Sequence, residues 1–127
     1  MNREIKFRAY QPEAKGDLKW WSWQELRECD LNTIFRHPER YHLMQYTGLK
    51  DKNGVEIYEG DIVVAFRGED CEEVNAVYYN ANHCKWFLGS PYNNKLPMGL
   101  GEFCWLDLEV IGNIYDNPEL LEVPGND

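Results

Sequence analysis

The segment from Gln45 to Phe66, QYTGLKDKNGVEIYEGDIVVAF, constrains the fold more than any other part of the chain. Asn53 and Gly54 tolerate the positive φ angles of a type I′ hairpin turn, because glycine lacks a Cβ atom and asparagine hydrogen-bonds its own backbone. Glu59-Gly60-Asp61 indicates a second turn. Residues 62–66 then run apolar on both faces, as in a strand that is buried on two sides or changes partners midway. This succession is typical of small, strongly bent β-barrels.

The first 40 residues predict a hairpin followed by a short helix. Residues 5–10 alternate between apolar and polar side chains, which indicates a half-buried strand with Lys6, Arg8 and Tyr10 on its wet face. Residues 18–21 are its expected return strand. Ser22 and Glu25 have the spacing of a capping box, so we expect a helix from Trp23 to about Cys29. Residues 30–40 are expected to be irregular, because they contain a His-Pro step.

The second half predicts three further strands and a terminal helix. Residues 74–79 and 85–88 are expected to form a hairpin, and 89–101 are rich in Gly, Pro and Asn, as in a long loop. A last strand follows at 106–114, and Gly112 on one of its faces suggests a close backbone approach or a kink. Asn117-Pro118-Glu119 is a helix-start pattern, with Asn as the cap and Pro in the first turn.

Three blocks of the chain resemble the YopX-like family of phage and prophage proteins. They are KFRAY, LMQYTGLKDKNGVEIYEGDIV and LEVIGNIYDNPELL, at Lys6–Tyr10, Leu43–Val63 and Leu108–Leu121. The resemblance implies a phage or prophage origin and an SH3-like barrel core, and it implies no activity. We therefore expect one mainly β domain over residues 1–127. It would comprise an N-terminal hairpin and short helix (1–40), a bent SH3-like barrel (41–116), and a C-terminal helix and tail (117–127).

Composition and charge narrow the classes of function. The sequence is 43% hydrophobic and has 5 Trp, 8 Tyr and 5 Phe, enough to build a core. It has no apolar run long enough for a membrane span and no signal-peptide pattern, so we expect a cytoplasmic protein of the bacterial host. Residues 1–52 hold 10 Lys/Arg against 8 Asp/Glu, whereas residues 53–127 hold 3 against 14. The acidic second half disfavours direct nucleic-acid binding.

Few residue patterns point to chemistry. The cysteines Cys29, Cys71, Cys84 and Cys104 lack CxxC spacing, so isolated reduced thiols are favoured over a zinc site that includes His83. A catalytic Cys84–His42 pair has no local support. Glu59 and Asp61 are better explained as turn residues than as paired catalytic carboxylates. Gly99-Leu100-Gly101 lacks the helix and basic residue of a phosphate loop. We therefore expect no catalytic residue, no metal and no cofactor.

The tryptophans Trp20, Trp21 and Trp23 form a possible interaction surface. Neighbouring strand residues point to opposite faces, so Trp20 and Trp21 cannot both enter one core. Tryptophan is enriched at binding hot spots. The alternative is a small peripheral core beneath the helix that starts at Ser22, and the sequence leaves the two interpretations open.

These observations favour a non-enzymatic phage accessory protein that acts through protein contacts. Its partner would be a second copy, giving a homo-oligomer, or another phage or host protein. The uneven charge supports this hypothesis, because a basic surface on one subunit would attract an acidic surface on another. The alternatives are an acidic decoy that inhibits a host nucleic-acid-binding protein and, third, an enzyme whose site is assembled from loops.

Overall fold

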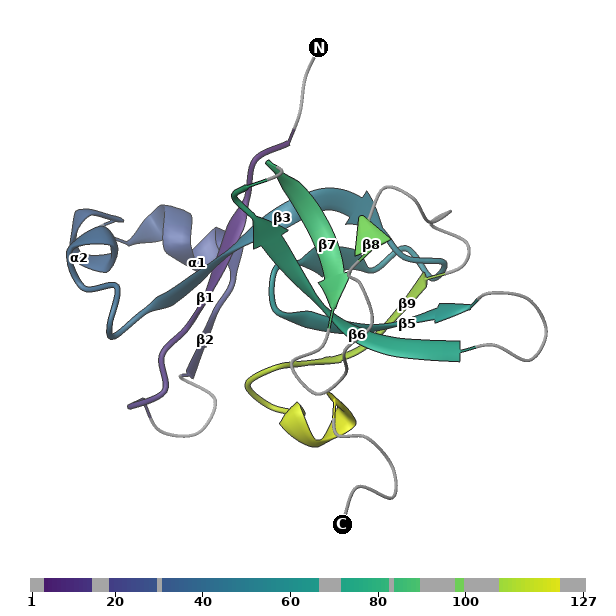
Figure 1. Cartoon of the computed structure of the whole chain (residues 1–127). Coiled ribbons are helices and arrows are strands. Elements are labelled where there is room, and N and C mark those ends of the chain that lie inside the picture. Colours follow the sequence, from purple (N-terminus) through teal and green to yellow (C-terminus); the bar gives the residue numbers. More distant parts are fainter. Residues whose placement is uncertain are drawn as a thin grey trace.

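The chain folds into two antiparallel sheets with short helices (Figure 1). The computed structural model describes residues 4–14, 19–29, 31–66, 72–82, 84–89, 98–99 and 108–121. The N-terminal sheet has the order β2 (Trp20–Trp21), β1 (Phe7–Tyr10), β3 (His42–Lys50), β4 (Glu56–Tyr58). The C-terminal sheet has the order β8 (Met98–Gly99), β7 (Lys85–Gly89), β6 (Glu72–Asn80), β5 (Asp61–Phe66), β9 (Leu108–Asn113). The fold is mainly β as expected, and the described strands do not close into a barrel.

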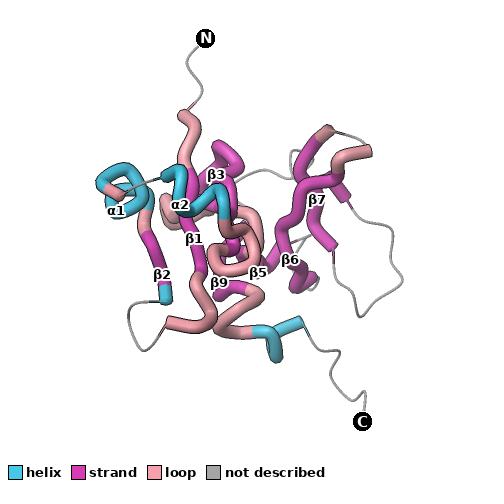
Figure 2. The backbone as a smooth tube through the Cα atoms, turned by 90° about the vertical axis from the view of Figure 1, so that its left-hand side faces the viewer, coloured by secondary structure: helices cyan, strands magenta, loops and turns pink. Residues whose placement is uncertain are grey.

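The protein has two clusters of buried hydrophobic residues. Helices α1 (Trp23–Glu28) and α2 (Leu31–Arg36) lie over one face of the N-terminal sheet, the face turned toward the viewer in Figure 2. The buried residues of this first core are Ala9, Leu26 and Ile34. The buried residues of the second core are Ile57, Val63, Ala65, Val77, Leu88 and Leu108. The second core includes residues of both sheets, because Ile57 lies on β4, so burial of apolar surface also holds the two sheets together.

Strand β3 joins the two halves of the N-terminal sheet, because it pairs with β1 and with β4 along different parts of its length. Its first residues, from His42 to Gln45, pair with β1. Its later residues pair with β4, with an irregular register between Tyr46 and Lys50. Gly48 lies in this irregular stretch with φ +91°. The N-terminal hairpin is therefore a continuation of the sheet that contains β3, and not a separate unit docked on a barrel.

The turn at residues 51–54 is present, but it is not a type I′ turn. Gly54 has φ +81°, and Asn53 does not have a positive φ angle, which type I′ requires. The turn is held instead by the buried carboxylate of Asp51, whose Oδ1 accepts the backbone N–H groups of Asn53 (2.8 Å) and Val55 (2.9 Å). The second turn is confirmed, with Gly60 at φ +87°.

Strand β5 is the centre of the C-terminal sheet. It pairs with β6 on one side and with β9 on the other. Its residues from Asp61 to Ala65 are all buried. This confirms the expectation of a strand covered on both faces, which the continuous apolar run indicated. The expected hairpin of residues 74–79 and 85–88 is also confirmed, as β6 and β7.

The region between Ser22 and Arg40 is more helical than expected. The capping box is confirmed: Ser22 Oγ accepts the Glu25 N–H at 3.2 Å, and the Glu25 carboxylate accepts the Ser22 N–H at 3.2 Å. The expectation of an irregular segment at 30–40 is wrong, because α2 occupies Leu31–Arg36. Ile34 is 4% exposed and belongs to the first core. Packing of this one side chain stabilises a helix too short to form alone.

The C-terminal part departs from expectation in two places. Within the expected loop at 89–101, Met98–Gly99 forms β8 and pairs with β7. The expected terminal helix is a 3-10 helix, η4, at Pro118–Leu121, and Asn117 does not cap it with its side chain. Asn117 Oδ1 instead accepts the N–H of Asn113 at 3.2 Å. The close approach expected at Gly112 is confirmed, since a Cβ there would lie 2.5 Å from Asn117 Oδ1.

None of the helices in the described part of the chain has the length and apolar character needed to cross a membrane.

Candidate interaction surface

The three tryptophans lie on two different faces of the N-terminal sheet. Strand register pairs Ala9 with Trp21 and Tyr10 with Trp20, so Trp20 and Trp21 point in opposite directions. Trp21 and Trp23 pack against the core beneath α1 and α2. Trp20 lies on the other face. Two of the tryptophans therefore belong to a peripheral core, and Trp20 lies away from it, where the interaction interpretation stays a prediction.

Trp20 belongs to a group of four rings that we call the Trp20 surface: Tyr10, Trp20, His42 and Tyr115. The ring of Tyr10 stacks on that of Tyr115 with centroids 4.4 Å apart, and lies 4.9 Å from that of Trp20. His42 Nδ1 and the Tyr115 hydroxyl are 3.1 Å apart and share a hydrogen bond. Tyr10 and His42 are cross-strand partners on β1 and β3, and Tyr115 reaches them from the turn after β9.

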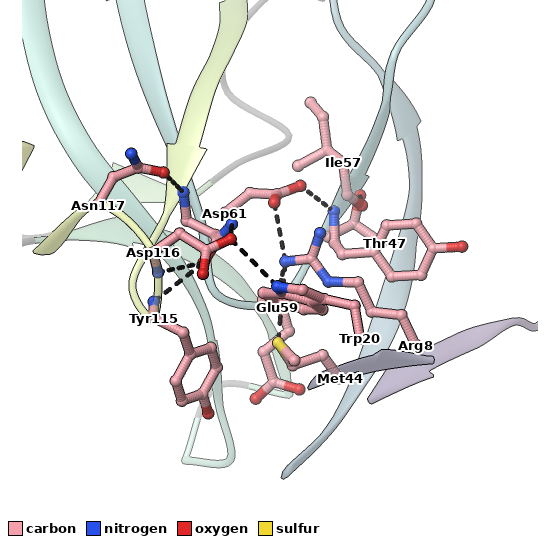
Figure 3. Close-up of polar contacts among 12 residues, drawn as sticks. Arg8, Trp20, Met44, Thr47, Ile57, Glu59, Asp61, Tyr115, Asp116 and Asn117 are labelled. Atoms are coloured by element: carbon pink, nitrogen blue, oxygen red, sulfur yellow. Dashed lines mark hydrogen bonds and ion pairs between the residues drawn. The ribbon is translucent and has the colours of Figure 1, made fainter. Parts of the chain in front are cut away.

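Asp116 lies at the edge of the Trp20 surface and accepts a hydrogen bond from Trp20. Trp20 Nε1 donates to Asp116 Oδ2 at 3.1 Å across 96 residues of sequence, as Figure 3 shows. The turn that carries Asp116 is shaped by Asn113, whose Oδ1 accepts the N–H groups of Tyr115 (3.0 Å) and Asp116 (2.9 Å). These local hydrogen bonds hold the turn in the conformation that presents both Tyr115 and Asp116 to Trp20.

Arg8 lies beside the Trp20 surface and ties it to the central strand. Its guanidinium donates to Asp61 Oδ1 at 2.8 Å and to the Glu59 carbonyl oxygen at 3.3 Å (Figure 3). It also lies 5.1 Å from the ring centroid of Trp20 and 4.9 Å from that of Tyr58, distances at which cation–π attraction operates. Arg8 Nε is buried and has no hydrogen-bond partner among the described residues.

The carboxylates near Arg8 differ in environment. Asp61 is 2% exposed, and burial raises its pKa, an effect that the Arg8 guanidinium and the Tyr58 N–H only partly offset. Burial also raises the pKa of Glu59. The pKa of Tyr115 is raised by burial first and then by the negative charge of Glu59. Asp116 is exposed. Asp116 forms no ion pair with a described cation, so its carboxylate at the edge of the rings is available to a partner.

The uneven charge along the sequence is partly cancelled within the fold. Lys6 pairs with Glu56, Arg8 pairs with Asp61, and Lys52 Nζ lies 3.2 Å from Glu109 Oε2. Each pair joins a cation from the first 52 residues to a carboxylate from the remainder. Pairing to Glu4 and Glu56 also raises the pKa of Lys6. Part of the uneven charge is thus neutralised by ion pairs within one chain, and fewer unpaired charges remain to attract a second chain.

The other expected sites are placed as follows. Glu59 and Asp61 belong to a turn and have separate environments, in agreement with the turn interpretation. Cys29 and Cys84 are free thiols, and Cys84 Sγ contacts the Ala81 carbonyl oxygen at 3.5 Å. The described residues contain no group of three or more His, Cys, Asp or Glu side chains suited to a metal ion. Cys71, His83, Cys104 and most of the Gly99–Gly101 loop lie outside the described residues.

Four residues of this site carried no functional expectation from the sequence. Arg8 and Tyr10 were assigned to the wet face of a strand, yet Tyr10 is only 9% exposed and Arg8 pairs with Asp61. The turn after β9 covers this face of β1. The alternation of polar and apolar residues in β1 was therefore a poor guide to which face is exposed to solvent. Tyr115 and Asp116 lie in the block Leu108–Leu121, which carried the family resemblance but no expectation for either side chain. The one sequence signal that could have linked any of these residues is the spacing of Arg8 and Tyr10. They are two positions apart in a strand, which places both side chains on the same face.

The fold and this surface define a small two-sheet β protein in which the turn after the last strand closes over the first strand. The chain belongs to the YopX protein family, whose model matches residues 3–122. Among solved structures it is similar to protein EF1440 from Enterococcus faecalis, with 26% sequence identity and a TM-score of 0.54. That similarity covers 95% of this chain and 100% of the other. None of the curated proteins matches the chain significantly.

Proposed function

We propose that this chain is a phage or prophage accessory protein that acts in the bacterial cytoplasm through protein contacts, without catalysis, and assembles as a homo-oligomer. Family membership is consistent with the proposed origin. The observation that carries the proposed contact role is the Trp20 surface. It places Trp20 and two tyrosines at a half-buried site with an exposed carboxylate at its edge.

The composition of the Trp20 surface fits a protein interface better than a plain core. Trp, Tyr and Arg are the residue types that contribute most to binding free energy in protein interfaces. Here Trp20, Tyr10, Tyr115 and Arg8 are held in fixed positions by hydrogen bonds and ring contacts. A surface held rigid before binding loses little conformational entropy when a partner docks.

We also propose that residues 41–116 are related to SH3-like barrels. The bend of β3 at its irregular stretch and the tight turn at Gly60 support this proposal. Asp51 adds a second link between the sheets, because its Oδ2 accepts the Val110 N–H of β9 at 2.8 Å.

The decoy hypothesis receives less support. It requires the carboxylates of residues 56–73 and 102–122 to face a basic partner as one continuous surface. Within the described residues, Glu56, Asp61 and Glu109 are already paired to cations of the same chain. We therefore do not propose this function.

The test of the proposed function is the molar mass in solution. Size-exclusion chromatography with light scattering, at low and high salt and at high micromolar concentration, should give a mass above that of one chain. The assembly should weaken as salt rises, since part of the attraction is between exposed charges. A strict monomer under both conditions would contradict self-assembly and leave a different protein as the partner.

A further inference from the structure

A second exposed surface lies on the opposite side of the N-terminal sheet from Trp20. It comprises Phe35, Arg36 and Arg40, and we call it the α2 patch. Phe35 is 58% exposed, the largest exposed fraction among the large hydrophobic residues that the structure describes. Arg36 and Arg40 are exposed, and neither forms an ion pair with another described residue. The neighbouring Ile34 is buried in the first core, so α2 is fixed on the sheet while Phe35 faces outward.

The α2 patch and the Trp20 surface have complementary chemistry. Asp116 is exposed and accepts hydrogen bonds from two uncharged groups, Trp20 Nε1 and Asn113 Nδ2 (3.3 Å). Neither Asp116 nor Glu59 forms an ion pair with a described cation. One surface thus offers aromatic rings with carboxylates that lack an ion-pair partner, and the other offers a phenyl ring with two guanidinium groups, of which that of Arg40 also attracts the Glu39 carboxylate.

The chain already contains one example of this type of recognition. The guanidinium of Arg8 lies near the rings of both Trp20 and Tyr58 and pairs with the carboxylate of Asp61. Arginine prefers such sites because its planar group stacks on aromatic rings and donates to carboxylates at the same time.

We propose that copies of this chain associate head to tail, with the α2 patch of one copy seated on the Trp20 surface of the next. The inference rests on the self-assembly proposed above and specifies its contact. Phe35 packs against the exposed edges of Trp20 and Tyr115. Arg36 or Arg40 donates to Asp116.

The placement of the two surfaces determines the form of the assembly. They lie on opposite faces of the N-terminal sheet, because Trp21 and Trp20 point to opposite sides and the helices cover the Trp21 side. A contact between two different surfaces is heterologous, and it generates rings when the rotation closes or open chains when it does not. Each copy in such an assembly retains both surfaces for its two neighbours.

A mixing experiment tests this arrangement. Trp20→Ala removes one surface and Phe35→Ala removes the other, so each variant alone should associate about tenfold or more weakly than wild type by sedimentation velocity. An equimolar mixture of the two should regain association but stop at dimers. In that dimer the Phe35→Ala copy supplies an intact Trp20 surface, and the Trp20→Ala copy supplies an intact α2 patch.

Two further variants separate binding from folding. Arg36→Glu combined with Arg40→Glu changes only exposed side chains, and should weaken association as much as Phe35→Ala while thermal unfolding stays unchanged. Tyr79→Ala removes another exposed aromatic ring, 46% exposed on β6, and should associate like wild type.

The outcomes are distinct. A wild-type monomer would overturn the self-assembly of the proposed function. A wild-type oligomer that none of the α2-patch variants weakens would overturn only the contact proposed here. A mixture of Trp20→Ala and Phe35→Ala that fails to form dimers, when each alone is folded and monomeric, would also overturn it.

Discussion

Arg8 of the first strand and Asp61 of the central strand form an ion pair of 2.8 Å across the junction of the two sheets. The Asp61 side chain is 3% exposed and that of Arg8 is 19% exposed, so the pair is largely removed from water. Asp61 Oδ2 also accepts the Tyr58 N–H at 2.7 Å. This one carboxylate thus positions both the turn before β5 and the guanidinium beside the Trp20 surface.

Removing Arg8 should strongly destabilise the protein. Arg8→Met leaves the Asp61 carboxylate buried without its counter-ion, and we expect the free energy of unfolding in urea to fall by about 3 kcal/mol. Lys52→Met is the matched control, because Lys52 and Glu109 are 36% and 34% exposed. Its cost should stay below about 1 kcal/mol. Equal costs for the two variants would show that Arg8 is not a buried link between the sheets.

Asp51 should make a large contribution to stability that is lost in acid. Burial opposes ionisation of Asp51, but N–H groups of Val110, Val55 and Asn53 outweigh it and hold the pKa of this carboxyl below its ordinary value. A lowered folded-state pKa gives stability that is complete above the unfolded value of 3.8 and is lost as the pH falls through the folded value.

We therefore expect Asp51→Asn to be less stable than wild type at pH 7 by about 2 kcal/mol, since an amide oxygen is a weaker acceptor than a carboxylate. The difference should shrink as the pH falls below about 4, where wild-type Asp51 also loses its charge. Urea unfolding at several pH values measures it. A difference that is constant down to pH 2 would mean that the charge of Asp51 is not what stabilises the turn.

Gly112 should not tolerate a larger residue while Asn117 is present. A Cβ at position 112 would lie 2.5 Å from Asn117 Oδ1, which accepts the Asn113 N–H. Gly112→Ala should lower the free energy of unfolding by about 1–3 kcal/mol by forcing this contact apart. Adding Asn117→Ala should recover part of the loss, because it removes the two nearest clashing atoms, Oδ1 and Cγ, and leaves only the Cβ at 3.0 Å. If the double variant loses more free energy of unfolding than the two single variants lose together, the proposed clash is not the cause.

The capping box should contribute measurably to the N-terminal core. Ser22→Ala removes the acceptor of the Glu25 N–H and should cost about 1 kcal/mol, whereas Ser22→Asp keeps an acceptor and should cost little. Thermal unfolding of both variants provides the comparison. An identical loss for Ala and Asp would show that the side-chain oxygen at position 22 is unimportant.

Local patterns in the sequence determined a large part of the secondary structure. The Ser22–Glu25 capping box, the turns at Gly54 and Gly60, the two-faced strand β5 and the β6–β7 hairpin were all predictable, because each depends on residues close together in the chain. The close approach at Gly112 was predictable for the same reason, since Asn117 is five residues away.

Tertiary structure alone decided where helix α2 and the Trp20 surface formed. Helix α2 exists because Ile34 reaches a core built from β1 and α1, which outweighs the irregular local pattern. Trp20 and Asp116 meet across 96 residues of sequence, and Arg8 pairs with Asp61 across the junction of the two sheets. Local sequence patterns do not predict such contacts, because their free energy depends on burial and proximity that arise only when the strands pair.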